Sequence, residues 1–220
     1  RKLNLKLGIK IGGCEAMKDL MECKQIGTEY IIAPMVETDY SLKKFIEAKN
    51  KIFDKNERKG TEFLINVETI TTTKNIDQII NLNNKYEDID RINGWVFGRV
   101  DYTLSSGLDR EDINREEKVT KKIIETSKKA LDNKLNLVVG GGISVDALEI
   151  LKNIKQTHLS RFETRKVIFS SDALKIKNLS EGMLKAVNFE LLWLKNKKNY
   201  YGSIFKEDDK RIKMLSDRWE

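Results

Sequence analysis

The stretch Phe63-Leu64-Ile65-Asn66-Val67-Glu68-Thr69 is an apolar run that ends on an acid. A second run of the same kind, Trp95-Val96-Phe97-Gly98-Arg99-Val100-Asp101, follows it in the chain. Both are short, rich in β-branched or aromatic residues and apolar on successive positions, which is typical of strands buried on both faces of a parallel sheet. The two stretches therefore predict strands that carry carboxylates at their carboxyl ends.

Strand-like runs alternate with helix-like segments on both sides of these two stretches. The predicted strands cover residues 7–12, 30–36, 63–68, 94–101, 137–142 and 166–172. The predicted helices between them cover residues 14–26, 41–50, 75–84, 116–131 and 145–154. This alternation predicts βαβ units and therefore an α/β fold.

Polar residues gather where the predicted strands end, and both a (β/α) barrel and an open sheet bind ligands there. No glycine fingerprint of the dinucleotide or Walker type is present. Six strands are fewer than the eight of the usual barrel, and the chain shown starts at Arg1. We therefore predict a TIM (β/α)8 barrel whose first two strands lie outside this chain.

The character of the sequence changes after residue 178, which divides the chain into two predicted parts. Residues 1–178 form the barrel, and residues 179–220 form a C-terminal helix with a charged extension. One interpretation of this extension is a last barrel helix followed by a solvated tail. The other is an oligomer contact, because Trp193, Tyr200, Tyr201 and Trp219 give it more aromatic surface than a tail needs.

Composition narrows the function classes. The 220 residues are 40% hydrophobic and 34% charged, with a mean hydropathy of -0.50 and a net charge of +7. No apolar run approaches the ~20 residues of a membrane span, and the basic residues form no long stripe with interleaved aromatics. We expect neither a membrane nor a nucleic-acid partner. Cys14 and Cys23 are too far apart in one predicted helix to bridge, and free thiols fit a cytoplasmic protein.

Glu68 and Asp101 are the strongest candidates for chemistry in the residues themselves. Acids that end adjacent barrel strands converge, because the carboxyl ends of parallel strands share one edge of the sheet. Oxygen-rich sites of this kind suit hard cations such as Mg²⁺ or Mn²⁺. The alternative is that each acid is an ordinary helix N-cap.

Four motifs occur in one order along the chain. They are Lys10-Ile11-Gly12-Gly13, Ala33-Pro34-Met35-Val36-Glu37-Thr38, Asn66-Val67-Glu68-Thr69 and Phe97-Gly98-Arg99-Val100-Asp101-Tyr102-Thr103-Leu104-Ser105-Ser106-Gly107. Together they resemble the aldolase/citrate lyase family, which comprises metal-dependent pyruvate-type aldolases and acyl-lyases on a TIM barrel. The resemblance covers residues 7–172 and makes the six strands numbers three to eight of that barrel.

The resemblance implies a role for particular residues. Glu68 and Asp101 correspond to the family's two ligands for a divalent metal, Mg²⁺ or Mn²⁺. Lys10 lies where the family usually has an arginine that contacts the keto oxygen and carboxylate of the substrate. Gly98, Arg99 and Thr103 lie in the loop that flanks the substrate carboxylate.

The resemblance also implies an activity and an assembly. The implied protein is a carbon–carbon lyase that acts on a 2-oxo acid or acyl substrate through a metal-stabilised enolate. It is also expected to be a homo-oligomer.

Two departures from the family pattern keep other functions open. Lys10 replaces a planar, bidentate arginine with a point charge, and the single histidine, His158, precedes the last predicted strand, so the general base is unassigned. One rival function is a catalytically altered barrel that binds or assembles. Another is a phosphate-binding barrel enzyme centred on Gly140-Gly141-Gly142, although those glycines could equally form a tight turn. Residues 161–166 are predicted to be a structural ion-pair cluster at the opposite face.

Overall fold

The computed structural model describes residues 5–219, without the side chains of residues 116, 218 and 219. Seven strands form one sheet in the order β1-β2-β3-β4-β5-β6-β7. The first six pair in parallel, and the last pair is antiparallel. The strands are β1 Gly8–Lys10, β2 Tyr30–Ala33, β3 Glu62–Val67, β4 Gly94–Gly98, β5 Asn136–Gly140, β6 Arg161–Glu163 and β7 Ile168–Ser170.

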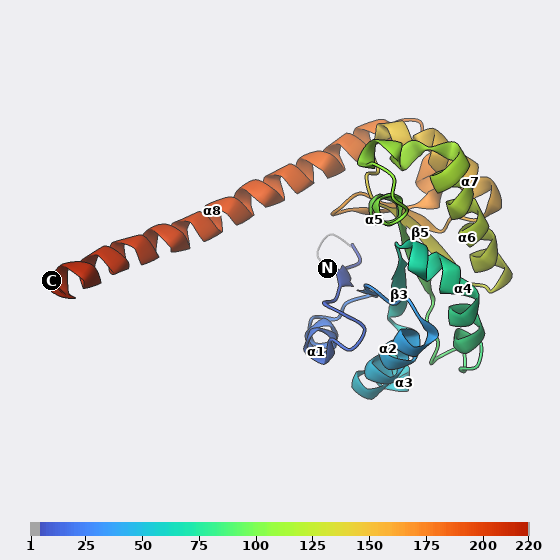
Figure 1. The fold of residues 1–220 in the computed structure, drawn as a ribbon, viewed down its shortest axis with the longest axis horizontal. Helices are drawn as coiled ribbons and strands as arrows, with labels where there is room; N and C mark the ends of the chain where they lie inside the picture. The colour runs from blue at the N-terminus through green and yellow to red at the C-terminus, as the bar shows by residue number, and fades with distance from the viewer. Residues whose placement is uncertain (1–4, 220) are drawn as a thin grey trace.

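Helices connect successive strands and surround the sheet (Figure 1). The α-helices are α1 Met17–Ile26, α2 Asp39–Ile52, α3 Lys55–Lys59, α4 Ile70–Asn83, α5 Arg99–Ser105, α6 Lys121–Asp132, α7 Leu148–Thr157 and α8 Leu179–Trp219. The short helices are η1 Arg110–Asn114, η2 Glu116–Thr120, η3 Val145–Ala147 and η4 Ser171–Lys175. Thr38 caps α2 and Thr69 caps α4 through their side-chain oxygens. Glu68 therefore lies between the end of β3 and the cap of α4.

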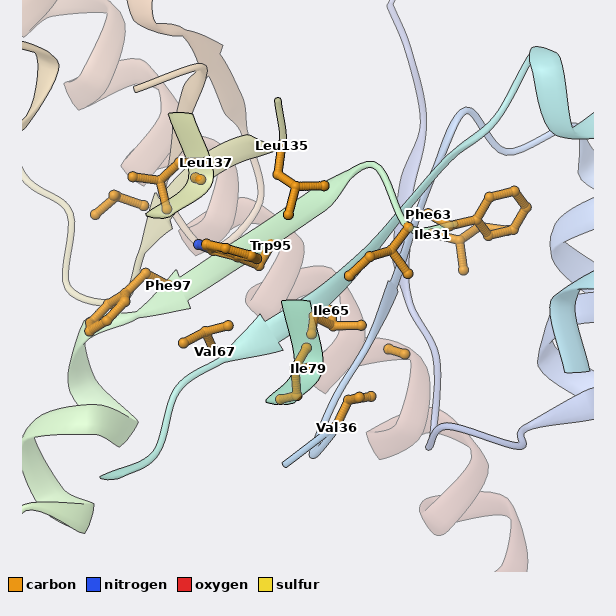
Figure 2. Close-up of a cluster of buried hydrophobic side chains, with 14 of the residues drawn as sticks. Ile31, Val36, Phe63, Ile65, Val67, Ile79, Trp95, Phe97, Leu135 and Leu137 are labelled. Atoms are coloured by element: carbon orange, nitrogen blue, oxygen red, sulfur yellow. The ribbon is translucent and has the colours of Figure 1, made fainter. Parts of the chain in front are cut away.

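The main hydrophobic core lies between the outer face of the sheet and these helices. Figure 2 shows Phe63, Ile65 and Val67 of β3 beside Trp95 and Phe97 of β4, all at alternate positions of their strands. These five side chains are at most 1% exposed. Because strand side chains alternate between faces, the residues between them face the inside of the curled sheet.

The inner face is built in three layers of side chains, one above another along the strands. The layer at the amino ends contains Tyr30, Glu62, Asn136 and Arg161. The middle layer is apolar and contains Ile32, Leu64, Val96 and Val138. The layer at the carboxyl ends contains Lys10, Asn66, Glu68 and Glu163, with Gly98 and Gly140. Ionisable groups therefore occupy both ends of the inner face, with an apolar layer between them.

The sheet curls until its two edge strands approach each other. A Cβ built on Gly8 of β1 would lie 3.4 Å from Cδ1 of Ile168 of β7. The structure therefore confirms an α/β fold with a mostly parallel sheet. Within residues 5–219 this sheet is a curled half-barrel, and a closed eight-stranded barrel is not formed.

The sixth parallel strand lies where the sequence predicted a connecting cluster of charges. That strand is β6, whereas the predicted strand at residues 166–172 contains β7, which runs antiparallel. Two of the three residues of β6 are charged, and both face the inner side, where Arg161 pairs with Glu62. A strand that buries ion-paired charges has no apolar run, so the pattern that identified the other strands missed it.

The predicted strand at residues 94–101 is also shorter than expected. β4 ends at Gly98, and Arg99 begins α5. Asp101 therefore lies in the first turn of a helix, where an acid is favoured by the helix dipole.

The C-terminal segment is a single helix of 41 residues, α8. Its first turns pack on the core through Leu179, Met183 and Ala186, which are at most 8% exposed. Beyond them the helix extends away from the rest of the molecule as one long rod (Figure 1). None of the helices within residues 5–219 is both long enough and apolar enough to cross a membrane.

Candidate functional site

Lys10 and Glu68 meet at the carboxyl end of the inner face. The Nζ atom of Lys10 lies 3.3 Å from Oε1 and 3.4 Å from Oε2 of Glu68. The carboxylate is buried, with its side chain 7% exposed, whereas the lysine side chain is 50% exposed. Asn66 also donates from Nδ2 to Oε2 of Glu68, so the buried carboxylate is held by one amide and one half-exposed cation.

Two glycines make room for the acids of this layer. A Cβ on Gly98 would lie 2.7 Å from Cβ and 2.9 Å from Oε2 of Glu68. A Cβ on Gly140 would lie 2.7 Å from Oε1 of Glu163. Real Cβ atoms do not approach so closely, so any side chain at these two positions would displace the carboxylates.

Glu163 is a site residue that the sequence analysis missed. It ends β6 on the inner face, and its carboxylate makes no hydrogen bond or ion pair with any residue in the described part of the chain. Burial raises the pKa of Glu163 to about 7; the nearby Lys10 and Arg161 charges oppose the shift and Glu68 adds to it. The alternation Arg161-Phe162-Glu163, with the apolar residue facing outward, is the signal that could have identified this strand and its acid.

The side chains of Arg99 and Thr103 form hydrogen bonds within α5 and with the neighbouring η1. Arg99 is fully buried, and its Nη2 donates to the backbone oxygen of Ile113, 3.2 Å away, and to Asn114. Burial lowers the pKa of Arg99 to about 10. Thr103 donates from Oγ1 to the backbone oxygen of Arg99 at 2.7 Å. Within residues 5–219, no hydrogen bond or ion pair joins either side chain to Glu68.

Asp101, the last residue of the predicted strand, lies in the first turn of α5, three residues after β4 ends. Its side chain is exposed, and no ion pair or hydrogen bond joins it to another described residue. The structure thus brings together Lys10, Glu68 and Gly98, and it places Asp101 at the neighbouring helix without a direct contact.

The local geometry of the triple glycine and of His158 indicates structural roles for both. Gly141 and Gly142 have φ angles of +82° and +61°, and a Cβ on Gly141 would lie 2.9 Å from the backbone nitrogens of Arg99 and Val100. Glycine is therefore required by a tight turn that packs against α5. His158 ends α7, and its Nε2 lies 3.0 Å from the backbone oxygen of Leu135, which precedes β5 and so lies at the amino end of the sheet.

Whether this site could bind a divalent metal ion depends on how many ligands the chain supplies. Within residues 5–219, no group of three or more His, Cys, Asp or Glu side chains is placed to hold an ion alone. Mg²⁺ commonly keeps several waters and uses only one or two carboxylates together with substrate oxygens. Glu68 and Asp101 fit that donor set, and the buried Oδ1 of Asn66 beside Glu68 has no protein partner in the described structure.

The sequence of residues 11–148 matches the family model described as HpcH/HpaI aldolase/citrate lyase. This match covers more than half of the chain. The chain belongs to the HpcH/HpaI aldolase/citrate lyase family. Lys10, just outside the matched segment, and Glu68, Gly98 and Asp101 within it are therefore embedded in a lyase-type scaffold. No curated protein sequence matches the chain.

Solved structures with the same fold include other proteins of this kind. RipC from Yersinia pestis is 14% identical, with a TM-score of 0.55 over 81% of this chain and 78% of RipC. The citrate synthase SbnG is 13% identical, with a TM-score of 0.54 over 83% of this chain and 69% of SbnG. An HpcH/HpaI aldolase/citrate lyase family protein from Burkholderia cenocepacia J2315 is 10% identical, with a TM-score of 0.53 over 81% of this chain and 72% of that protein. At these identities the likeness establishes the fold.

Proposed function

We propose that this chain is a carbon–carbon lyase of the aldolase/citrate lyase type that acts on a 2-oxo acid or acyl substrate. The observation that carries the proposal is the pair formed by buried Glu68 and half-exposed Lys10 at the carboxyl end of the sheet. Family membership makes a lyase scaffold the context of this pair. Active sites of barrel-type α/β enzymes lie at this end of their strands.

Lys10 is the substrate-binding cation of this proposal. Its ammonium is the partner of Glu68, and its exposed stem lets it turn toward a ligand. An anionic substrate group that enters beside Glu68 would meet this ammonium. The same positive charge stabilises the enolate that forms when a C–C bond breaks or a C3 proton leaves.

Glu68 and Asp101 are the residues that would hold a divalent ion, Mg²⁺ or Mn²⁺. A bound ion supplies a Lewis acid that polarises the substrate's keto oxygen. Glu68 provides the buried negative charge, and Asp101 provides an exposed carboxylate without a partner in the described structure. Gly98 keeps the space beside the Glu68 carboxylate free of a side chain.

Glu163 is our candidate for the proton acceptor that the sequence analysis left unassigned. Its carboxylate lies on the inner face of β6, against Gly140 and within the field of Lys10 and Glu68. It is also unpaired in the described chain, so accepting a proton breaks no ion pair or hydrogen bond of the fold. A general base must lie within hydrogen-bonding reach of the proton that it accepts, and this position on the inner face is where a substrate bound by Lys10 would lie.

A binding or assembly protein on the same scaffold is the second candidate. The observation in its favour is that Lys10 already neutralises Glu68 while Arg99 is turned toward η1. In that case the carboxyl-end layer would be a structural ion pair. Metal binding separates the two candidates, because a structural pair has no reason to release its carboxylate to an ion.

Titration with Mn²⁺, followed by electron paramagnetic resonance of the free ion, tests the metal part of the proposal. The wild-type protein is expected to bind one Mn²⁺ ion per chain. Glu68→Gln and Asp101→Asn should each weaken binding by more than about tenfold, because a neutral amide gives up the charge that holds a hard cation. Asp132→Asn, which changes an exposed acid at the end of α6, is the matched control and should bind like wild type. Binding that is absent in the wild type or unchanged in Glu68→Gln would favour the assembly function.

A further inference from the structure

The rod-like part of α8 carries a stripe of exposed apolar side chains that repeats every seven residues. The spacings alternate between three and four positions, which is the pattern of a two-stranded coiled coil. Eight side chains of this stripe are between 46% and 66% exposed: Leu184, Val187, Leu191, Leu194, Tyr201, Phe205, Ile212 and Leu215. We call these eight, together with Lys198 and Asp208, the α8 seam.

The seam is a different face of α8 from the one that contacts the rest of the chain. Toward its own barrel the helix uses Met183 and Ala186, which are buried. Further along the same side, Glu190 lies 4.0 Å from Arg165, and the ring of Trp193 lies 5.1 Å from Nζ of Lys166. The seam residues next to these positions remain exposed, so intramolecular packing does not account for them.

Two charges interrupt the apolar seam, and their signs are opposite. Lys198 and Asp208 fall on the same three-and-four spacing, ten residues apart, where apolar residues are otherwise found. In a parallel pair of α8 helices, Lys198 would face a second Lys198 and Asp208 a second Asp208. Like charges at buried seam positions are costly, so this pattern disfavours a parallel arrangement.

We propose that α8 pairs with α8 of a second copy of this chain as an antiparallel coiled coil centred on Ser203. In this register every seam residue from 191 to 215 meets a chemically matched residue of the other copy. Leu191 meets Leu215, Leu194 meets Ile212, Tyr201 meets Phe205, and Lys198 meets Asp208. The overlap spans about 36 Å of helix.

Self-complementarity of the seam is the argument for a second copy as the occupant. A two-fold axis at Ser203 reproduces each contact twice, which is how isologous interfaces form. An unrelated partner would have no reason to match the positions of Lys198 and Asp208 by the symmetry of this one helix. The long, unsupported rod in Figure 1 gives the second helix a free face along its length.

The residues that flank the α8 seam favour this antiparallel register on one side of the helix and disfavour it on the other. Beside the Lys198–Asp208 layer, Lys195 lies opposite Asp209 of the second copy, which is favourable. On the other flank, Lys197 lies opposite Arg211, which is unfavourable. The seam charges are therefore the decisive element of the register, and Arg211→Glu should tighten the pair.

Sedimentation equilibrium of the full chain tests the proposal through a charge swap. Wild type should dimerise in the micromolar range, and Lys198→Asp or Asp208→Lys should each raise the dimer Kd at least tenfold by placing like charges together. The double variant Lys198→Asp/Asp208→Lys should return to within about threefold of wild type, because the pair is restored with reversed signs. Lys210→Asp, the same charge change on the outer side of the helix, should leave the Kd unchanged.

Cross-linking gives an orientation-specific check in a Cys14→Ser background. A mixture of Lys198→Cys and Asp208→Cys chains should form an intermolecular disulfide, whereas Lys198→Cys alone should not, since its two copies lie about 15 Å apart along an antiparallel pair. Efficient cross-linking of Lys198→Cys alone would show a parallel pair and overturn the proposal. A wild-type chain that stays monomeric at 100 µM, or that uses α8 to bind anionic lipid vesicles as a monomer, would also overturn it.

Discussion

Lys10 and Lys49 both lie against the sheet, and their surroundings give them different roles. Lys10 is half exposed and has a carboxylate partner at the site. Lys49, in α2, is fully buried on the outer side of the sheet, where its Nζ lies 4.7 Å from the centre of the Phe63 ring and 2.8 Å from Oδ1 of Asn50. A buried ammonium without a bound carboxylate is costly, so Lys49 makes stability depend on pH.

Burial lowers the pKa of Lys49 to about 7; the like charge of Arg58 adds to the shift and Asp90 opposes it. Its pKa in the unfolded chain is about 10.4. Between these values the unfolded state binds more protons, so the free energy of unfolding should rise with pH, by about 1.4 kcal/mol per unit at most. Lys49→Met should remove this dependence and stabilise the fold by roughly 1–3 kcal/mol at pH 7.

Urea denaturation of both proteins at pH 7 and pH 9 measures this difference. From pH 7 to pH 9, the free energy of unfolding of the wild type should rise by about 2 kcal/mol relative to that of Lys49→Met. A constant difference between the two proteins would mean that Lys49 keeps its ordinary pKa in the folded chain.

At the scale of elements, β6 is held by charge rather than by an apolar run. Arg161 binds Glu62 through two nitrogens, at 3.1 and 2.5 Å, and lies 4.5 Å from the centre of the Tyr30 ring. Asn136 donates to the same carboxylate at 3.0 Å. Glu62 of β3 thus binds side chains of both β5 and β6, and Tyr30 of β2 packs on the arginine that Glu62 holds.

Arg161→Met should therefore lower the free energy of unfolding by about 2–3 kcal/mol, because it leaves Glu62 partly buried without its cation. Arg165→Met is the matched control: Arg165 follows in the next turn, is 82% exposed, and approaches Glu190 only to 4.0 Å. Its effect should stay within about 0.5 kcal/mol. Equal effects of the two substitutions in thermal or urea unfolding would show that the Arg161–Glu62 pair is not what holds β6.

The sequence predicts those elements whose residues are apolar on the outer face and follow a clear period. β1 to β5 and the longer helices α1, α2, α4 and α6 agree with these predictions, with boundaries that differ by a few residues, whereas the short helices α3 and α5 were not predicted. β6 and the direction of β7 were not predicted, because Arg161 is explained only by its ion pair with Glu62, far away in the chain, and Glu163 only by its position beside Gly140. Tertiary ion pairs of this kind leave no local pattern.

The same limit applies to the site. The acid after an apolar strand identified Glu68, and its contact with Lys10 joins residues 58 positions apart. The burial of the Arg99 side chain could not be predicted from the sequence, because it depends on contacts with Ile113 and Asn114 of η1. Glu163 entered the site only through the pairing of β6 with β5.

At the scale of the whole molecule, the curled sheet separates two polar layers by an apolar one. The amino-end layer is closed by a paired Arg161–Glu62 and is structural. The carboxyl-end layer has a half-exposed cation, an unpaired acid and two glycines that leave room beside the carboxylates. This asymmetry is why we assign chemistry to one end only. The rod-like part of α8 extends away from this scaffold and carries the surface through which we propose that two copies pair.

Exchange of the C3 protons of pyruvate for deuterium, followed by proton NMR, is the direct test of the proposed lyase chemistry. The full-length chain with Mg²⁺ or Mn²⁺ should catalyse exchange, because enolate formation is the step that Lys10, Glu68 and Asp101 are proposed to support. Lys10→Met and Glu68→Gln should slow it by about a hundredfold or more, and Asp132→Asn should match wild type. Exchange by the folded, metal-loaded wild type no faster than that of metal in buffer, or exchange that survives Glu68→Gln, would show that this site does not form an enolate.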